Sequence, residues 1–129
     1  MRTLLCGLLV GGIWTLLSVV VLFVVGDAFL AALPRGGPTG RGIDLFLLAM
    51  NVAGGIWAMW LYAALRPRYG AGWRTAFIAG LAWWIIVSLQ SAKWAAIVAV
   101  PPAAALAPAA GTLLAILTSI MVGAWAYER

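Results

Sequence analysis

Long uncharged apolar stretches limit what this chain can fold into more than any other feature of its sequence. The first runs from Leu4 to about Val25 without a charged residue. As a helix it would be roughly 33 Å long, enough to cross the hydrocarbon core of a bilayer. Of the 129 residues, 66% are hydrophobic and 9% are charged, and a water-soluble domain of this size could not bury so much apolar surface. The sequence therefore predicts an integral membrane protein.

The spacing of the apolar stretches predicts four membrane-spanning helices in one domain. Prolines, glycines and charged residues separate the stretches, and the prolines and glycines among them commonly end helices. We expect an all-α, integral membrane, antiparallel four-transmembrane-helix bundle that occupies residues 1–129. Its helices are expected at about 4–32, 43–65, 73–100 and 109–127. The proline-rich segment 101–108 is expected to lie outside the helices, at the membrane interface.

A short basic turn at 66–74 indicates the orientation. It contains Arg66, Arg68 and Arg74 between two apolar stretches, and short loops of this charge stay on the cytoplasmic side. An even number of crossings places both termini on that side, so we expect a multi-pass protein of the cell inner membrane with both termini cytoplasmic. Five basic residues on this side against three on the other leave a dual orientation open. The arginines can gain about 1 kcal/mol each from anionic headgroups, and membrane lipid is therefore an expected partner.

Small residues repeat at every fourth position in the first and the fourth apolar stretches. This spacing lets the backbone of another helix approach closely. We call these repeats the small-residue stripes, and we expect them to mark helix-packing faces, directed either to this subunit or to a partner. The residues are Gly7 and Gly11 in the first stretch and Gly111, Ala115, Ser119 and Gly123 in the fourth.

A few polar residues map by helical rise to the outer half of the membrane. For Asn51 the favoured interpretation is an interhelical hydrogen bond worth roughly 0.6 to 2 kcal/mol. For Lys93 it is an ammonium group that stretches to the outer interface. The alternative interpretation is a polar vestibule, formed by Asp27, Asp44, Asn51, Gln90, Ser91 and Lys93.

Residues that catalyse reactions or bind metals are scarce in this chain. It has no histidine, one cysteine (Cys6) and three carboxylates. This composition disfavours haem and zinc sites and general acid-base catalysis, so we expect neither an enzyme nor a cofactor nor a metal. The net charge of +5 comes mostly from residues that flank apolar stretches, which indicates membrane topology and not nucleic-acid binding.

A distinctive pattern covers the middle of the chain and its tail. It consists of the run Trp60–Gly70, then Gly72, Thr75–Ala76, Ala79–Leu81, Trp84 and the closing 123–127. The pattern resembles a stretch in small uncharacterised bacterial four-helix integral membrane proteins, which have no known function. The resemblance implies the membrane fold and a bacterial source, and no activity. Members of that family carry an acidic residue in the first helix, where this chain has Thr15 and Ser18.

Two better-known families of similar size match less well. Small multidrug transporters also have four helices, but their coupling needs a carboxylate buried in the first helix, which this chain lacks. Fluoride channels have an asparagine in the second helix that is similar to Asn51, but the Phe-Ser-Thr-Phe-type run of their third helix is replaced here by the run Ala79–Trp84.

These patterns favour a structural function. We expect an accessory integral membrane protein that packs against partner helices through its small-residue stripes, as a homo-oligomer or within a larger membrane complex. A small channel or transporter that uses the polar vestibule is the alternative.

Overall fold

The computed structural model describes residues 1–25, 31, 41–97 and 99–129, and for 41–44 the backbone alone. All regular structure in this part of the chain is helical, with no strand. The helices are α1 (Arg2–Val25), α3 (Arg41–Tyr69), α4 (Trp73–Ile97) and α5 (Pro102–Glu128). The predicted all-α fold is confirmed for these residues.

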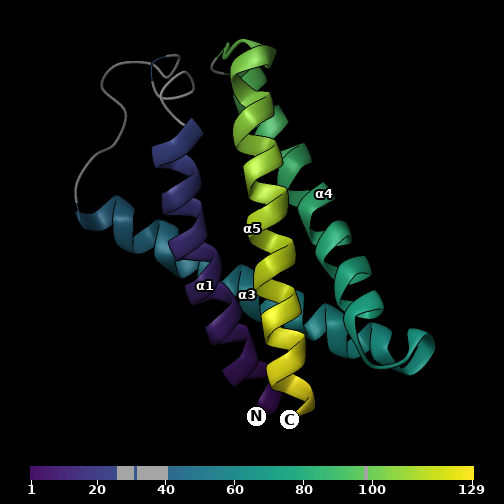
Figure 1. Ribbon diagram of the computed structural model, residues 1–129. Helices are drawn as coiled ribbons and strands as arrows, with labels where there is room; N and C mark the ends of the chain where they lie inside the picture. The colour runs from purple at the N-terminus through teal and green to yellow at the C-terminus, as the bar shows by residue number, and fades with distance from the viewer. Residues whose placement is uncertain (26–30, 32–40, 98) are drawn as a thin grey trace.

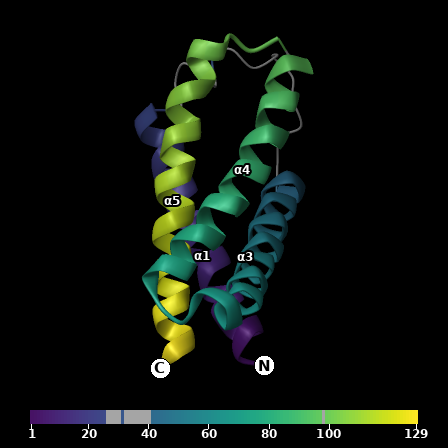
Figure 2. The same cartoon turned by 90° about the vertical axis from the view of Figure 1, so that its right-hand side faces the viewer.

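Successive helices run in opposite directions, and both chain termini lie at one end of the bundle (Figures 1 and 2). We call this the terminus end and the other the opposite end. The α1 helix packs against α3 and α5, and α4 packs mainly against α5. The α3 helix crosses α1 obliquely, so its first half leaves the other helices (Figure 1). The turn between α3 and α4 therefore lies at the terminus end.

Each of the four described helices contains a segment long and apolar enough to cross a membrane. The candidate spans are Arg2–Val25, Leu45–Tyr69, Trp73–Ile97 and Pro102–Glu128. They suggest a multi-pass membrane protein. The predicted first helix extended to residue 32, and its last part, 26–30 and 32, lies outside the described residues.

The turn after α3 is shorter than the predicted 66–74. The α3 helix continues through Pro67 to Tyr69, although proline lacks the N–H for one helical hydrogen bond. The Gly70 N–H donates to the Arg66 carbonyl at 2.9 Å. Gly70 and Gly72 have φ angles of +83° and +121°, which glycine adopts without strain. The arginines therefore lie on helix ends and not in a loop.

The last helix begins earlier than predicted, at Pro102 instead of 109. Proline suits the first helical position because its missing N–H has no partner there in any case, and the Ala104 N–H donates to the Pro101 carbonyl at 2.9 Å. Pro108 lies inside the helix. The prediction that 101–108 lies outside the helices is thus wrong for 102–108.

The α4 helix ends at Ile97, before the predicted boundary at 100. Ala99 has a φ of +56°, and the Val100 N–H donates to the Ala95 carbonyl at 2.9 Å. This six-to-one hydrogen bond around a left-handed residue is the geometry of a Schellman cap, which closes helices.

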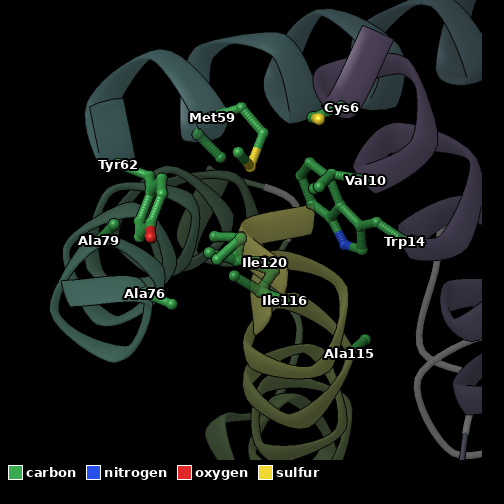
Figure 3. Close-up of a cluster of buried hydrophobic side chains, with 12 residues drawn as sticks. Cys6, Val10, Trp14, Met59, Tyr62, Ala76, Ala79, Ala115, Ile116 and Ile120 are labelled. Atoms are coloured by element: carbon green, nitrogen blue, oxygen red, sulfur yellow. The ribbon is translucent and has the colours of Figure 1, made fainter. Parts of the chain in front are cut away.

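The buried core lies in the half of the bundle nearest the termini. Figure 3 shows Val10, Met59 and Ile120 projecting toward one another from three helices. The buried cluster consists of Cys6, Val10, Trp14, Ala58, Met59, Tyr62, Ala76, Ala79, Ala115, Ile116, Ile120 and Ala124. By contrast, six consecutive residues of α3, 45–50, and six of α4, 89–94, are all exposed. A helix packed on one side would show exposed residues on the other side alone, so these two segments are uncovered all round.

Candidate functional site

Glycines bring α1 and α3 into backbone contact. A Cβ atom on Gly7 would lie 2.5 Å from the Cα atom of Ile56, and one on Gly11 would lie 2.6 Å from the Cα atom of Val52. On α3, a Cβ atom on Gly55 would overlap the backbone of Gly7 and Gly11. Since any larger residue would push the helices apart, glycine permits this crossing. The stripe predicted in the first apolar stretch is thus occupied by α3 of the same chain.

The stripe of the fourth apolar stretch also packs inside the chain. Ala115 and Ser119 are buried. A Cβ atom on Gly111 would lie 2.5 Å from the Cγ1 atom of Val21 on α1, and one on Gly123 would overlap side chains of α1 and α3. The sequence left open whether this stripe meets the same subunit or a partner, and the structure places it within the chain.

Asn51 forms a hydrogen bond between two helices. Its side-chain amide on α3 donates to the hydroxyl oxygen of Thr15 on α1 at 3.2 Å. The Thr15 hydroxyl in turn donates to the Gly11 carbonyl at 2.8 Å. The structure thus gives Asn51 the interhelical bond that the sequence favoured, and it supplies the partner, which the sequence did not identify.

The other vestibule candidates do not join Asn51. Gln90, Ser91 and Lys93 are exposed on the last turns of α4, and the α4 backbone makes no contact with α1, where the partner of Asn51 lies. Asp27 lies outside the described residues, as does the side chain of Asp44. The vestibule candidates whose side chains the structure describes therefore do not converge: Asn51 bonds to α1, whereas the three on α4 are exposed.

A cavity of about 150 Å³ lies between α1 and α5. It is lined by Leu17, Val20, Val21, Gly111, Leu114, Ala115 and Thr118. Its lining is almost wholly apolar and contains none of the vestibule candidates. A polar substrate would find few hydrogen-bond partners there.

Tryptophan rings fill the space between α1 and α4. Trp14 and Trp83 meet edge to face, with ring centroids 6.3 Å apart, and both rings cover Gly54, whose added Cβ atom would lie 2.7 Å from Trp14. The adjoining space has no room for a water molecule. The indole N–H of Trp83 is buried without a hydrogen-bond partner, whereas that of Trp84 donates to the Ala109 carbonyl at 3.1 Å.

At the terminus end, Tyr62 connects α3 to the end of α5 and to the turn. Its side chain is 0% exposed. The hydroxyl donates to the carboxylate of Glu128 and accepts from the Gly72 N–H at 3.3 Å. Its ring meets that of Tyr127 edge to face, at 5.9 Å between centroids. We call Tyr62, Gly72 and Glu128 the terminal clasp.

The sequence did not predict the terminal clasp. Aromatic residues such as Tyr62 near the end of an apolar stretch are typical of the headgroup boundary, and Glu128 looks like a residue of a solvated tail. One feature of the sequence could have pointed to this contact: Glu128 is the one carboxylate in the last apolar stretch and its tail.

Arginines at the terminus end lie over aromatic rings. A guanidinium in this position is attracted by the negative face of the ring. Within the described part of the chain none of these arginines forms an ion pair. The pairs, with distances from Cζ to the ring centroid, are Arg66 with Tyr127 (5.8 Å), Arg68 with Tyr69 (5.9 Å), Arg74 with Trp73 (5.6 Å) and Arg129 with Trp125 (4.4 Å).

Groups that could hold a metal ion are not found among the residues that the structure describes: no three histidine, cysteine, aspartate or glutamate side chains gather there. Cys6 is buried and free. The exposed polar groups include the guanidiniums and the Glu128 carboxylate at the terminus end, and the amide, hydroxyl and ammonium groups of Gln90, Ser91 and Lys93 on α4.

Comparisons with protein-family models, with curated proteins and with solved structures find no match to this chain. The resemblance to small bacterial four-helix membrane proteins therefore stays a prediction from the sequence.

Proposed function

We propose that this protein is an integral membrane bundle that acts as a structural or accessory subunit. It packs the uncovered surfaces of α3 and α4 against partner helices, either of a second copy or of a larger membrane complex. The four candidate spans support the membrane location. The observation that carries the packing role is the exposure of Gln90 and Ser91 on α4.

The orientation follows from the basic residues. Arg66 and Arg68 lie in the last turn of α3, Arg74 is the second residue of α4 and Arg129 follows α5. These helix ends lie at the terminus end (Figure 1). Such residues stay on the cytoplasmic side. The basic residues support a proposed orientation with both termini in the cytoplasm, and the sequence resemblance supports a bacterial inner membrane as the proposed location.

Exposed amides are unfavourable in hydrocarbon. Gln90 lies about 25 Å along α4 from Trp73, within the roughly 30 Å of a hydrocarbon core. An amide that faced lipid would leave its N–H and C=O groups without partners. A neighbouring helix with polar side chains would satisfy these groups, as α1 does for Asn51 within the chain.

The partner surface differs from the one that the sequence favoured. The stripes of α1 and α5 are filled by helices of the same chain. Within the described part of the chain, the segments whose consecutive residues are all exposed include 45–50 of α3 and 89–94 of α4, at the opposite end of the bundle. Partner helices at these segments would complete an assembly that the single chain leaves open.

The channel or transporter alternative has no supporting observation among the described residues. Asn51 is engaged by Thr15, whereas Gln90 and Lys93 are exposed on another helix. Trp14 and Trp83 occupy the space between α1 and α4 where a central path would run.

The experiment is site-specific photo-crosslinking in native membranes. A benzophenone amino acid replaces Gln90 in one variant and Phe77 in the control, since both side chains are exposed on α4 but lie in different halves of it. The proposal predicts protein adducts at Gln90 and none at Phe77. Equal yields at the two positions, or lipid adducts alone at Gln90, would contradict it.

A second measurement uses the mass of the detergent-solubilised particle. Gln90→Leu removes the amide and keeps a similar volume, and it is expected to shift the particle to a lower mass. Phe77→Leu is the matched control and is expected to leave the mass unchanged. A strictly monomeric wild-type protein with no copurifying partner would contradict the proposed role.

A further inference from the structure

We infer that the terminus end of the bundle carries a binding surface for the phosphate headgroups of anionic membrane lipids. This headgroup surface consists of Arg66, Arg68, Arg74 and Arg129 together with the rings of Tyr127, Tyr69, Trp73 and Trp125. This inference goes beyond the proposed function because it concerns lipid recognition. The headgroup surface lies at the end of the bundle away from the partner surface.

The first argument is the charge that the protein leaves uncompensated. Glu128 is the carboxylate at this end of the described chain, and its Oε1 atom accepts a hydrogen bond from Tyr62, a tyrosine that is fully buried. The described arginines form no ion pair. Each guanidinium has five N–H donors whose planar arrangement matches the oxygens of a phosphate. The surface is thus complementary to an anion with which the described residues do not pair it.

The second argument is the geometry of the aromatic rings. A ring below a guanidinium attracts the cation without using its N–H donors, so the donors at the guanidinium edge stay available for an anion. Trp73 is 64% exposed and Trp125 is 59% exposed. Exposed tryptophans at the ends of hydrocarbon-length helices occupy the headgroup layer of a bilayer. The layer that surrounds these rings contains lipid phosphates, which favours a lipid over a free anion or an acidic protein.

The third argument is that several helices build the surface. The guanidinium of Arg66 on α3 lies over Tyr127 on α5, and Arg74 lies over Trp73 in the first turn of α4. Helix dipoles would favour cations at the carboxyl ends of α3 and α5, but they disfavour a cation in the first turn of α4. The dipoles therefore do not account for Arg74, whose position in the first turn of α4 is compatible with a common anionic ligand.

The test is a lipid titration of the full-length protein in a neutral detergent. The eight tryptophans report thermal unfolding through their fluorescence. Phosphatidylglycerol is expected to raise the unfolding midpoint, and phosphatidylcholine is expected to raise it less. Replacing two arginines with glutamine is expected to weaken the apparent affinity for phosphatidylglycerol about thirtyfold.

Two double variants and one control make the result interpretable. Arg66→Gln with Arg129→Gln alters the contact with Tyr127 on another helix, so this variant tests folding as well. Arg68→Gln with Arg74→Gln removes pairs formed with adjacent residues alone, so this variant is expected to retain the fold. Lys93→Gln removes an exposed cation near the far end of α4. Because this position lies on the proposed partner surface, the comparison uses the apparent affinity for phosphatidylglycerol, which is expected to match that of the wild type.

Each unexpected outcome overturns the inference in a distinct way. Equal stabilisation by phosphatidylcholine would show that the surface does not recognise charge. Equal stabilisation by inorganic phosphate at the same phosphate concentration would identify a site for small anions, and equal stabilisation by polyglutamate would identify an acidic protein as the ligand. An equal loss in Lys93→Gln would show that net charge alone, and not this surface, attracts the lipid.

Discussion

The hydroxyl of Tyr62 on α3 donates a hydrogen bond to the carboxylate of Glu128, 66 positions later in the chain at the end of α5. The same hydroxyl accepts from the Gly72 N–H, so one buried oxygen joins two helices and a turn. The contact fixes the end of the bundle where both termini lie (Figure 1). Because Tyr62 is also part of the buried cluster, the polar contact and the apolar core stabilise the same end.

The first prediction concerns this hydroxyl. Tyr62→Phe keeps the ring and removes the hydrogen bonds, one of them to a charged group, so it is expected to reduce the free energy of unfolding by about 2 kcal/mol. Unfolding in mixed micelles, followed by tryptophan fluorescence, measures the change. Tyr69→Phe is the control because Tyr69 is 51% exposed. Equal losses of unfolding free energy in the two variants would show that the hydrogen bonds of the terminal clasp do not stabilise the fold.

The second prediction uses two neighbouring glycines of α1. Gly11→Ala places a methyl group 2.6 Å from the Cα atom of Val52, and it is expected to destabilise the bundle by about 1 to 3 kcal/mol, as overpacking does. Gly12→Ala meets no atom within 4 Å and is expected to be neutral or slightly stabilising. The same unfolding assay compares them. A larger loss of stability in Gly12→Ala than in Gly11→Ala would contradict the contact between α1 and α3 at Gly11.

The third prediction is a coupling between Asn51 and Thr15. In a double-mutant cycle with Asn51→Ala and Thr15→Ala, the two substitutions are expected to couple by about 0.6 kcal/mol, the average for hydrogen bonds between membrane helices. Thr15→Ser keeps the hydroxyl and is expected to retain the coupling. Additive effects of the two alanine substitutions would mean that the hydrogen bond does not form in the membrane.

The fourth prediction separates two adjacent tryptophans. The indole N–H of Trp84 donates to the Ala109 carbonyl, whereas that of Trp83 is buried without a partner. Replacing either with phenylalanine removes a similar volume, but Trp84→Phe also loses a hydrogen bond. Trp84→Phe is therefore expected to lower the free energy of unfolding by about 1 kcal/mol more than Trp83→Phe does. The thermal unfolding midpoints of the two variants give the comparison, and a larger loss in Trp83→Phe would contradict the assigned ring orientations.

The helices could be predicted from the sequence because length and hydropathy alone define candidate spans. The ends of the helices could not be predicted from the sequence where prolines were involved. Pro67 and Pro108 both lie inside helices, where each lacks the N–H for one helical hydrogen bond without ending the helix. Proline content by itself does not distinguish these positions from a loop.

The contacts between helices were less predictable than the helices. Small-residue spacing identified Gly7, Gly11 and Gly123 as packing positions, but a one-dimensional pattern does not say which helix packs against them. The structure shows that α1, α3 and α5 use these positions for one another. The bond between Tyr62 and Glu128 depends on how four helices are arranged, and no local pattern contains that information.

The most direct measurement is the location of the two ends of the chain. A reporter that is active in the cytoplasm alone, and one that is active outside it alone, are fused in turn after Arg129 and before Met1. A bundle of four crossings with the arginine-rich end inside predicts cytoplasmic activity at both termini, in a protein that stays in the membrane fraction. Activity of the two termini in opposite compartments, or release of the chain into the soluble fraction, would contradict it.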